Sequence, residues 1–83
     1  MTQPITLTLY FREYCSLCHT MLAQLKQLQQ SYPFLLDIRD VDADPELEAR
    51  FDEKVPVLMY EEEELCHWHL DLTRVNAFLK EIR

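Results

Sequence analysis

Two cysteines three residues apart, Cys15 and Cys18, are the residues of this 83-residue chain best suited to chemistry. Such a pair can close a reversible disulfide, because residues three apart on a helix are neighbours. When the pair opens a helix, the unpaired N–H groups and the positive end of the helix dipole favour the thiolate of the first cysteine. The spacing therefore predicts Cys15 as a nucleophile and Cys18, one turn further along and more buried, as its resolving thiol.

The segments on either side of the pair predict a strand and a helix that position it. Apolar and polar residues alternate over residues 5–10, which is typical of a strand. Apolar residues then recur every three or four positions, which predicts a helix over about residues 16–30. The expected apolar stripe of this helix contains Leu17, Met21, Leu22, Leu25 and Leu28.

The next two segments predict a second strand and a short helix. The second strand covers residues 34–41, and with the first strand and the helix it makes a parallel β-α-β unit. Asp44 and Pro45 are favoured residues for the N-cap and first turn of a helix. Leu47 and Phe51, four residues apart, give this short helix one buried face.

The C-terminal third predicts a hairpin and a closing helix. Strands over residues 55–60 and 64–67 form an antiparallel pair, linked by a solvated tip of glutamates. Asp71 is the expected N-cap of the last helix. The apolar positions of that helix are Leu72, Val75, Phe78, Leu79 and Ile82. The chain thus reads as one α/β domain over residues 1–83, in the order β-α-β-α-β-β-α.

Composition excludes several classes of function. A net charge of −7 and a pI near 4.7 argue against nucleic acid, because no basic cluster is present to neutralise phosphates. No apolar run has the length of a membrane span, and no signal peptide is visible at the start. We expect a cytoplasmic monomer. Glycine is absent, so phosphate loops are excluded and any turn with positive φ must use another residue.

Several motifs together resemble a known family. Leu9-Tyr10 leads into Cys15-Ser16-Leu17-Cys18, Val41-Asp42 ends the second strand, and Val55-Pro56-Val57 opens the third. In these features the chain resembles the small bacterial glutaredoxin-like proteins of the thioredoxin superfamily. The resemblance implies a thioredoxin fold with a four-stranded mixed sheet, helices on both faces, and a cis Val55-Pro56 bond beside Cys15. A proline at the start of a strand is by itself compatible with either isomer.

The activity we expect is thiol–disulfide exchange with a protein or small-molecule disulfide. No resident cofactor is expected, and glutathione is a candidate co-substrate. Arg12 and Lys54 are nearby cations that could favour the thiolate or attract a carboxylate. Tyr14 could border a substrate groove. The resemblance implies that Val55, beside Pro56, offers backbone groups to a bound peptide or glutathione.

The chain departs from typical glutaredoxins at two places. Ser16-Leu17 replaces the usual Pro-Tyr between the cysteines. Cys66-His67-Trp68-His69 stands where a Gly-Gly pair helps to seat the glutathione carboxylate in that family. The sequence therefore does not predict a carboxylate seat at this position.

Three alternatives remain open at the level of sequence. Cys15 to His19 matches a haem-attachment pattern, but that chemistry belongs to exported proteins, and we expect His19 to face solvent. A thioredoxin-fold binding module with little turnover is the second alternative. A metal site is the third, with no standard zinc spacing. Its candidate ligands are Cys15, Cys18, Cys66, His67 and His69. We expect Cys66 to be a half-buried strand residue.

Overall fold

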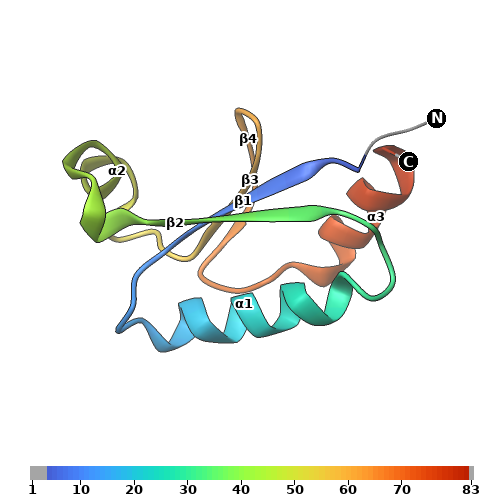
Figure 1. The fold of residues 1–83 in the computed structure, drawn as a ribbon, viewed down its shortest axis with the longest axis horizontal. Helices are drawn as coiled ribbons and strands as arrows, with labels where there is room; N and C mark the ends of the chain where they lie inside the picture. The colour runs from blue at the N-terminus through green and yellow to red at the C-terminus, as the bar shows by residue number, and fades with distance from the viewer. Residues whose placement is uncertain (1–3, 83) are drawn as a thin grey trace.

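The computed structural model describes residues 4–82 and contains the predicted elements in the predicted order, with one additional 3₁₀ turn (Figure 1). The bounds are β1 Thr6–Phe11, α1 Ser16–Leu28, β2 Leu35–Asp40, η1 Val41–Ala43, α2 Pro45–Phe51, β3 Val57–Tyr60, β4 Glu63–His67 and α3 Leu72–Ile82. The predicted boundaries differ from these by at most two residues.

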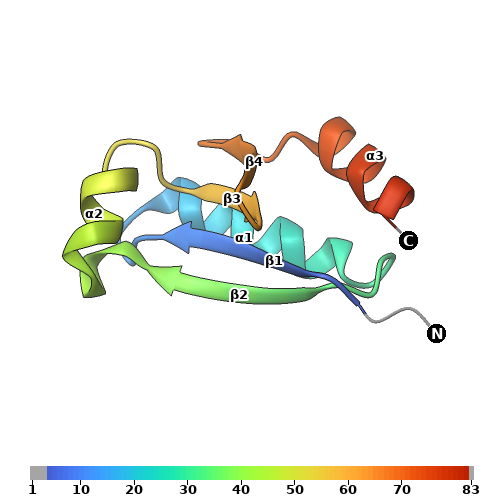
Figure 2. The ribbon, with the colours of Figure 1, turned by 90° about the horizontal axis from the view of Figure 1, so that it is seen from above.

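The four strands form one mixed sheet in the order β2-β1-β3-β4 (Figure 2). β1 and β2 are parallel, with Leu9 opposite Ile38, as expected for a β-α-β unit. β3 is antiparallel to both of its neighbours, and its pairing with β4 shifts register between Leu58 and Met59. This arrangement confirms the thioredoxin-like fold.

Two clusters of buried side chains hold the helices against the sheet. α1 and α3 pack on one face, whereas α2 lies at the end of the molecule where β1 and β2 finish (Figures 1 and 2). The larger cluster joins the sheet to α1 and α3, and includes Leu7, Leu9, Leu58, Met21, Leu25, Val75 and Leu79. The smaller cluster contains Cys18, Val41, Phe51, Val55, Val57 and Met59.

The aromatic stack between Tyr10 and Phe51 attaches α2 to the sheet. The two ring centroids lie 4.3 Å apart, with an interplanar angle of 20°. Because side chains alternate along a strand, Tyr10 faces the side opposite to Leu9, which packs with α1 and α3. Helices therefore contact both faces of the sheet, as the resemblance implied, although α2 reaches only its end.

Within residues 4–82 of this glycine-free chain, two residues adopt positive φ, Glu61 (φ 53°) and Trp68 (φ 66°). Glu61 lies in the β3–β4 turn. Because the chain has no glycine, a turn position with positive φ was expected to use another residue, and Glu61 is that residue. Trp68 follows β4 directly, and its conformation could not be predicted from the sequence. The Val55-Pro56 peptide bond is cis, as the family resemblance implied.

Two positions of the predicted apolar stripes are exposed. Leu17 is 38% exposed and Leu72 is 52% exposed. Each lies in the first turn of its helix. The predicted burial of Ile82 concerns a side chain outside the described part of the chain. Helix α1 ends at Leu28 rather than near residue 30, because a tighter turn carries the chain into β2.

Candidate functional site

Cys15 is the N-cap residue of α1, at the point where the loop after β1 becomes helical. Its backbone is extended (φ −103°, ψ 109°), and its sulfur accepts the backbone N–H of Cys18 at an N···S distance of 3.1 Å. The N–H of Cys15 donates to the carbonyl of Arg12 at 3.2 Å, which closes the loop. An N–H donor at a helix start is the kind of group that favours a sulfur anion.

Cys18 is fully buried in the smaller cluster, beside Val41 and Val57. Burial, and next the hydrogen bond with Cys15, raise the pKa of the Cys18 thiol to about 12. Cys18 is therefore a neutral thiol near pH 7, whereas Cys15 is partly accessible at the protein surface. This difference is the one expected between a resolving thiol and an attacking one.

Val55 and the buried Pro56 form the loop that enters β3, and Val55 belongs to the cluster on which Cys15 packs. The N–H of Val55 donates to the carbonyl of Phe51 at 3.1 Å. The end of α2 therefore uses the N–H of Val55, and pairing of the Val55 backbone with a bound peptide stays a prediction. The carbonyl of Pro56 accepts the N–H of Trp68 at 2.9 Å.

The guanidinium of Arg12 ties the Cys15 loop to η1 and α2. Its Nε lies 2.9 Å from Asp42 Oδ1, and its Nη2 lies 2.8 Å from Asp52 Oδ1 and 3.8 Å from Glu48 Oε2. Hydrogen bonds to Asp52 and Asp42 raise the pKa of Arg12 above its already high ordinary value. Its charge is thus matched by carboxylates of the protein itself. An influence of Arg12 on the Cys15 thiolate stays a prediction.

Lys54 is also paired within the protein. Its Nζ donates to Glu64 Oε1, and the other oxygen of Glu64 lies 2.7 Å from Nδ1 of His67. The Lys54 hydrogen bond, together with the His67 contact, lowers the pKa of Glu64 below its ordinary value despite partial burial. Glu64 is therefore not part of the solvated tip that the sequence predicted, which is limited to residues 61–63.

His19 supports the Cys15 loop, a role that the sequence did not predict. Its side chain is half exposed, as expected, but its Nε2 donates to the carbonyl of Glu13 at 2.6 Å. The ring also meets Phe11 edge to face, with centroids 5.8 Å apart. Since Glu13 is two residues before Cys15, this bond fixes the path of the loop. In the sequence, the feature that could have indicated this role is the position of His19 directly after Cys18.

Tyr14 and Trp68 are large exposed side chains near the cysteines. Tyr14 is 84% exposed, so it does not pack into the core. Trp68 is 50% exposed, and its Nε1 donates to the carbonyl of Glu53 at 2.8 Å. Because its backbone N–H also donates to the carbonyl of Pro56, Trp68 spans the loop that precedes β3. The sequence left the place of Trp68 open.

The Glutaredoxin-like domain (DUF836) family matches residues 6–80. The chain belongs to this glutaredoxin-like family. A protein from Nitrosomonas europaea, solved by solution NMR, is 37% identical, with 95% of both chains covered and a TM-score of 0.82. A solved malarial protein is 20% identical, over 95% of this chain and 97% of the other, with a TM-score of 0.66, and shares the fold alone. No curated protein matches.

The described residues of this glutaredoxin-like domain do not support the metal-site alternative. Within residues 4–82, no three side chains of His, Cys, Asp or Glu converge on one point. Cys66 is buried in the larger cluster, where burial raises the pKa of its thiol, and His67 contacts Glu64. Cys66 is thus more deeply buried than the sequence predicted. None of the helices in these residues has the length and apolarity of a membrane span.

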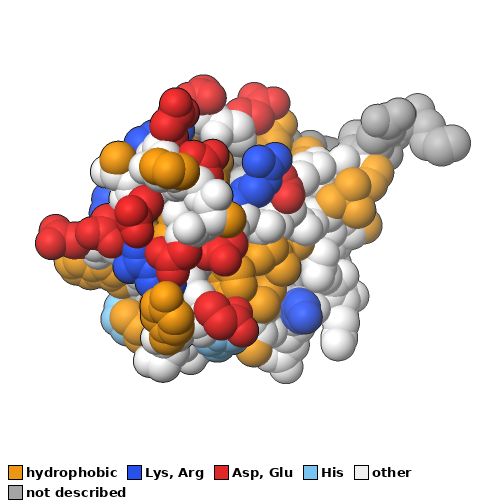
Figure 3. Space-filling model, turned by 60° about the vertical axis from the view of Figure 1, so that its left-hand side comes forward, with side chains coloured by type: hydrophobic (Ala, Val, Ile, Leu, Met, Phe, Trp, Pro, Cys, Tyr) orange, Lys and Arg blue, Asp and Glu red, His pale blue; other side chains and the backbone are white. Residues whose placement is uncertain are grey.

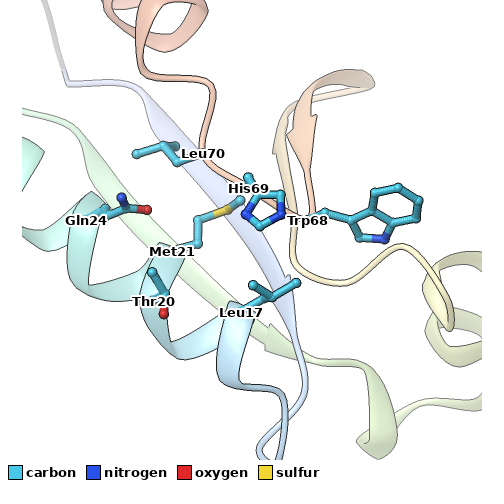
Figure 4. A pocket seen from close by; sticks show the side chains of 7 residues that line it. All are labelled: Leu17, Thr20, Met21, Gln24, Trp68, His69 and Leu70. Atoms are coloured by element: carbon cyan, nitrogen blue, oxygen red, sulfur yellow. The ribbon is translucent and has the colours of Figure 1, made fainter.

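A pocket of about 100 Å³ opens between α1 and the loop after β4 (Figure 4). Leu17, Thr20, Met21 and Gln24 line it from α1, and residues 68–70 line it from the loop. In Figure 4 the side chains of Leu17 and Met21 rise toward the loop that carries His69, and the Trp68 indole points away from α1. Since Leu17 lies between the two cysteines, the pocket adjoins the redox pair of the glutaredoxin-like domain.

Proposed function

We propose that this glutaredoxin-like domain is a thiol–disulfide oxidoreductase in which Cys15 attacks and Cys18 resolves. The Cys15 thiolate attacks one sulfur of a substrate disulfide, forms a mixed disulfide and releases the first substrate thiolate. Cys18 gives its proton to solvent and attacks Cys15 Sγ, which breaks the bond between Cys15 and the substrate, closes the Cys15–Cys18 disulfide and releases the second thiolate. Two electrons pass to the substrate, and an external thiol or a reductase returns the pair to the dithiol.

The observation that carries this proposal is the hydrogen bond from the Cys18 N–H to Cys15 Sγ at the start of α1. One short segment supplies an accessible sulfur with an anion-stabilising donor and a buried thiol one turn away. The hydrogen bond is local to the start of α1, whereas the burial of Cys18 comes from Val41, Val55 and Val57 of the smaller cluster.

Burial is the largest cause of the raised pKa of Cys18, and the hydrogen bond and negative charge of Cys15 add to it. When Cys15 enters a mixed disulfide its negative charge is lost, so this smaller contribution disappears and the Cys18 thiolate becomes easier to form.

Protein or small-molecule disulfides are the proposed substrates, in the cytoplasm and with no resident cofactor. A thioredoxin-fold binding module is the competing reading, and turnover distinguishes the two. The test is the reduction of a peptide disulfide driven by a dithiol reductant, with glutathione supplied in a parallel assay. We expect turnover by the wild type and by Cys66→Ala, and none by Cys15→Ser. Turnover that survives in Cys15→Ser, or its absence from the wild type with both reductants, would overturn the proposal.

A further inference from the structure

The surface around Cys15 is strongly acidic. Residues 40–54, which include η1 and α2, contain seven acidic and two basic residues. Glu13 adds a further exposed carboxylate two residues before Cys15. Figure 3 turns this end of the molecule toward the viewer and shows acidic side chains gathered there, with exposed hydrophobic side chains among them. A charged substrate that approaches Cys15 meets a negative field.

The two cations nearest to the site do not offset this field for an incoming anion. Arg12 contacts three carboxylates at 2.8 to 3.8 Å, and Lys54 pairs with Glu64. A carboxylate ligand would have to displace these partners. Glutathione carries two carboxylates and one ammonium group, so its net charge has the same sign as the site.

Backbone pairing for an extended small ligand is also reduced. The N–H of Val55 is donated to Phe51, and Trp68 spans the same loop through hydrogen bonds to Glu53 and Pro56. Trp68 takes a position where the family resemblance implied a glycine seat for a carboxylate. A tryptophan whose indole N–H is donated to Glu53 thus stands where that seat would need two glycines.

Apolar surface replaces these polar contacts. Tyr14, Leu17 and Trp68 are all exposed by more than a third, and each is close in sequence or structure to the cysteine pair. The pocket beside Leu17 measures about 100 Å³. Small-molecule sites typically enclose about 300–1,000 Å³, so this pocket fits one side chain rather than a whole tripeptide.

We propose that this surface binds the disulfide of a basic polypeptide, whose apolar side chain enters the pocket beside Leu17 and whose Lys or Arg residues face the carboxylates of η1 and α2. This inference rests on the proposed function and adds its substrate class. The chemical step is the exchange written above, with the sulfur nearest the basic flank joined to Cys15. Charge complementarity selects the partner, and the apolar pocket sets its register.

The test compares three substrates of the reduced wild-type protein under single-turnover conditions. Two peptide disulfides share one sequence with a leucine near the cysteine and differ only in lysine or glutamate flanks, and the third substrate is oxidised glutathione. At about 20 mM salt we expect the lysine peptide to react about ten-fold faster than the other two. At about 0.5 M salt the advantage should shrink, because screening weakens the field.

Three variants test whether the preference belongs to this surface. Glu13→Lys should reduce the advantage of the lysine peptide, whereas Glu62→Lys, the same change in the β3–β4 turn at the other end of β3, should preserve it. Leu17→Ala should slow the leucine peptide more than a matched alanine peptide. Equal or faster reaction of the glutamate peptide or glutathione would overturn this inference and leave the proposed function intact. Failure of all three disulfides to react would overturn both.

Discussion

The backbone nitrogen of Cys18 lies 3.1 Å from the sulfur of Cys15, so the residue that supplies the buried thiol also donates a hydrogen bond to the accessible sulfur. The two roles separate cleanly, because the first uses the side chain of Cys18 and the second uses its main chain. A substitution that removes the thiol and keeps the N–H therefore interrupts the reaction between its two steps.

Cys18→Ser should retain the first step and lose the second. The serine keeps the N–H that stabilises the Cys15 thiolate, but it has no sulfur to resolve the mixed disulfide. We expect intact-mass spectrometry to show one substrate attached per protein molecule, at Cys15. The matched variant Cys15→Ser should show no adduct, and an adduct of equal yield on that variant would contradict the assigned order.

His19→Ala should loosen the Cys15 loop. The substitution removes the hydrogen bond from Nε2 to the carbonyl of Glu13, for which a net contribution of about 1 kcal/mol is typical. We expect a lower free energy of unfolding in urea and slower formation of the mixed disulfide. Gln27→Ala, at an exposed position of the same helix, is the control and should change neither quantity. Equal effects of the two variants would assign no special role to His19.

Glu61→Gly should stabilise the protein. Glu61 has a φ of 53°, a conformation that is unfavourable for residues with a side chain and accessible to glycine. We expect a gain of about 0.5–1 kcal/mol, or a few degrees in Tm, by thermal unfolding. Glu61→Ala removes the same charge and keeps the unfavourable backbone, so it separates the two causes. A gain as large in the alanine variant would show that charge relief, not backbone conformation, is responsible.

Glu64 should make the stability fall in acid. Because the hydrogen bond from Lys54 lowers the pKa of Glu64 below its ordinary value of 4.5, its stabilising contribution is present above that value. The contribution is lost as the pH falls from 4.5 through the lower pKa of the folded state. Urea unfolding between pH 6 and pH 3 should show a smaller decrease for Glu64→Gln than for the wild type. Parallel pH profiles for the two proteins would rule out this linkage.

The element order could be predicted from the sequence because each element carries a strong local signal. The alternation around Leu7 and the three-to-four spacing around Met21 and Leu25 are typical of one strand and one helix. Asp44 and Asp71 cap the helices that the sequence assigned to them, with hydrogen bonds to Glu46 N–H and Arg74 N–H. The cysteine pair could be placed for the same reason, since an N-cap is a local feature.

The surroundings of the pair could not be predicted, because they depend on contacts across the fold. Arg12 meets Asp42 and Asp52 over separations of 30 and 40 residues, and no periodicity in the sequence indicates that pairing. The use of the Val55 N–H depends on how α2 ends. The position of Trp68 depends on a backbone conformation that is rare for a side chain of its size.

The measurement that tests the central claim most directly is the rate at which iodoacetamide labels each cysteine of the reduced, folded protein near pH 7. We expect Cys15 to react faster than Cys18 and Cys66 by a factor on the order of ten or more, because burial raises the pKa of both other thiols and the thiolate is the reactive form. In denaturant the three rates should converge. Equal rates in the folded protein, or faster labelling of Cys18, would contradict the assignment of Cys15 as the nucleophile.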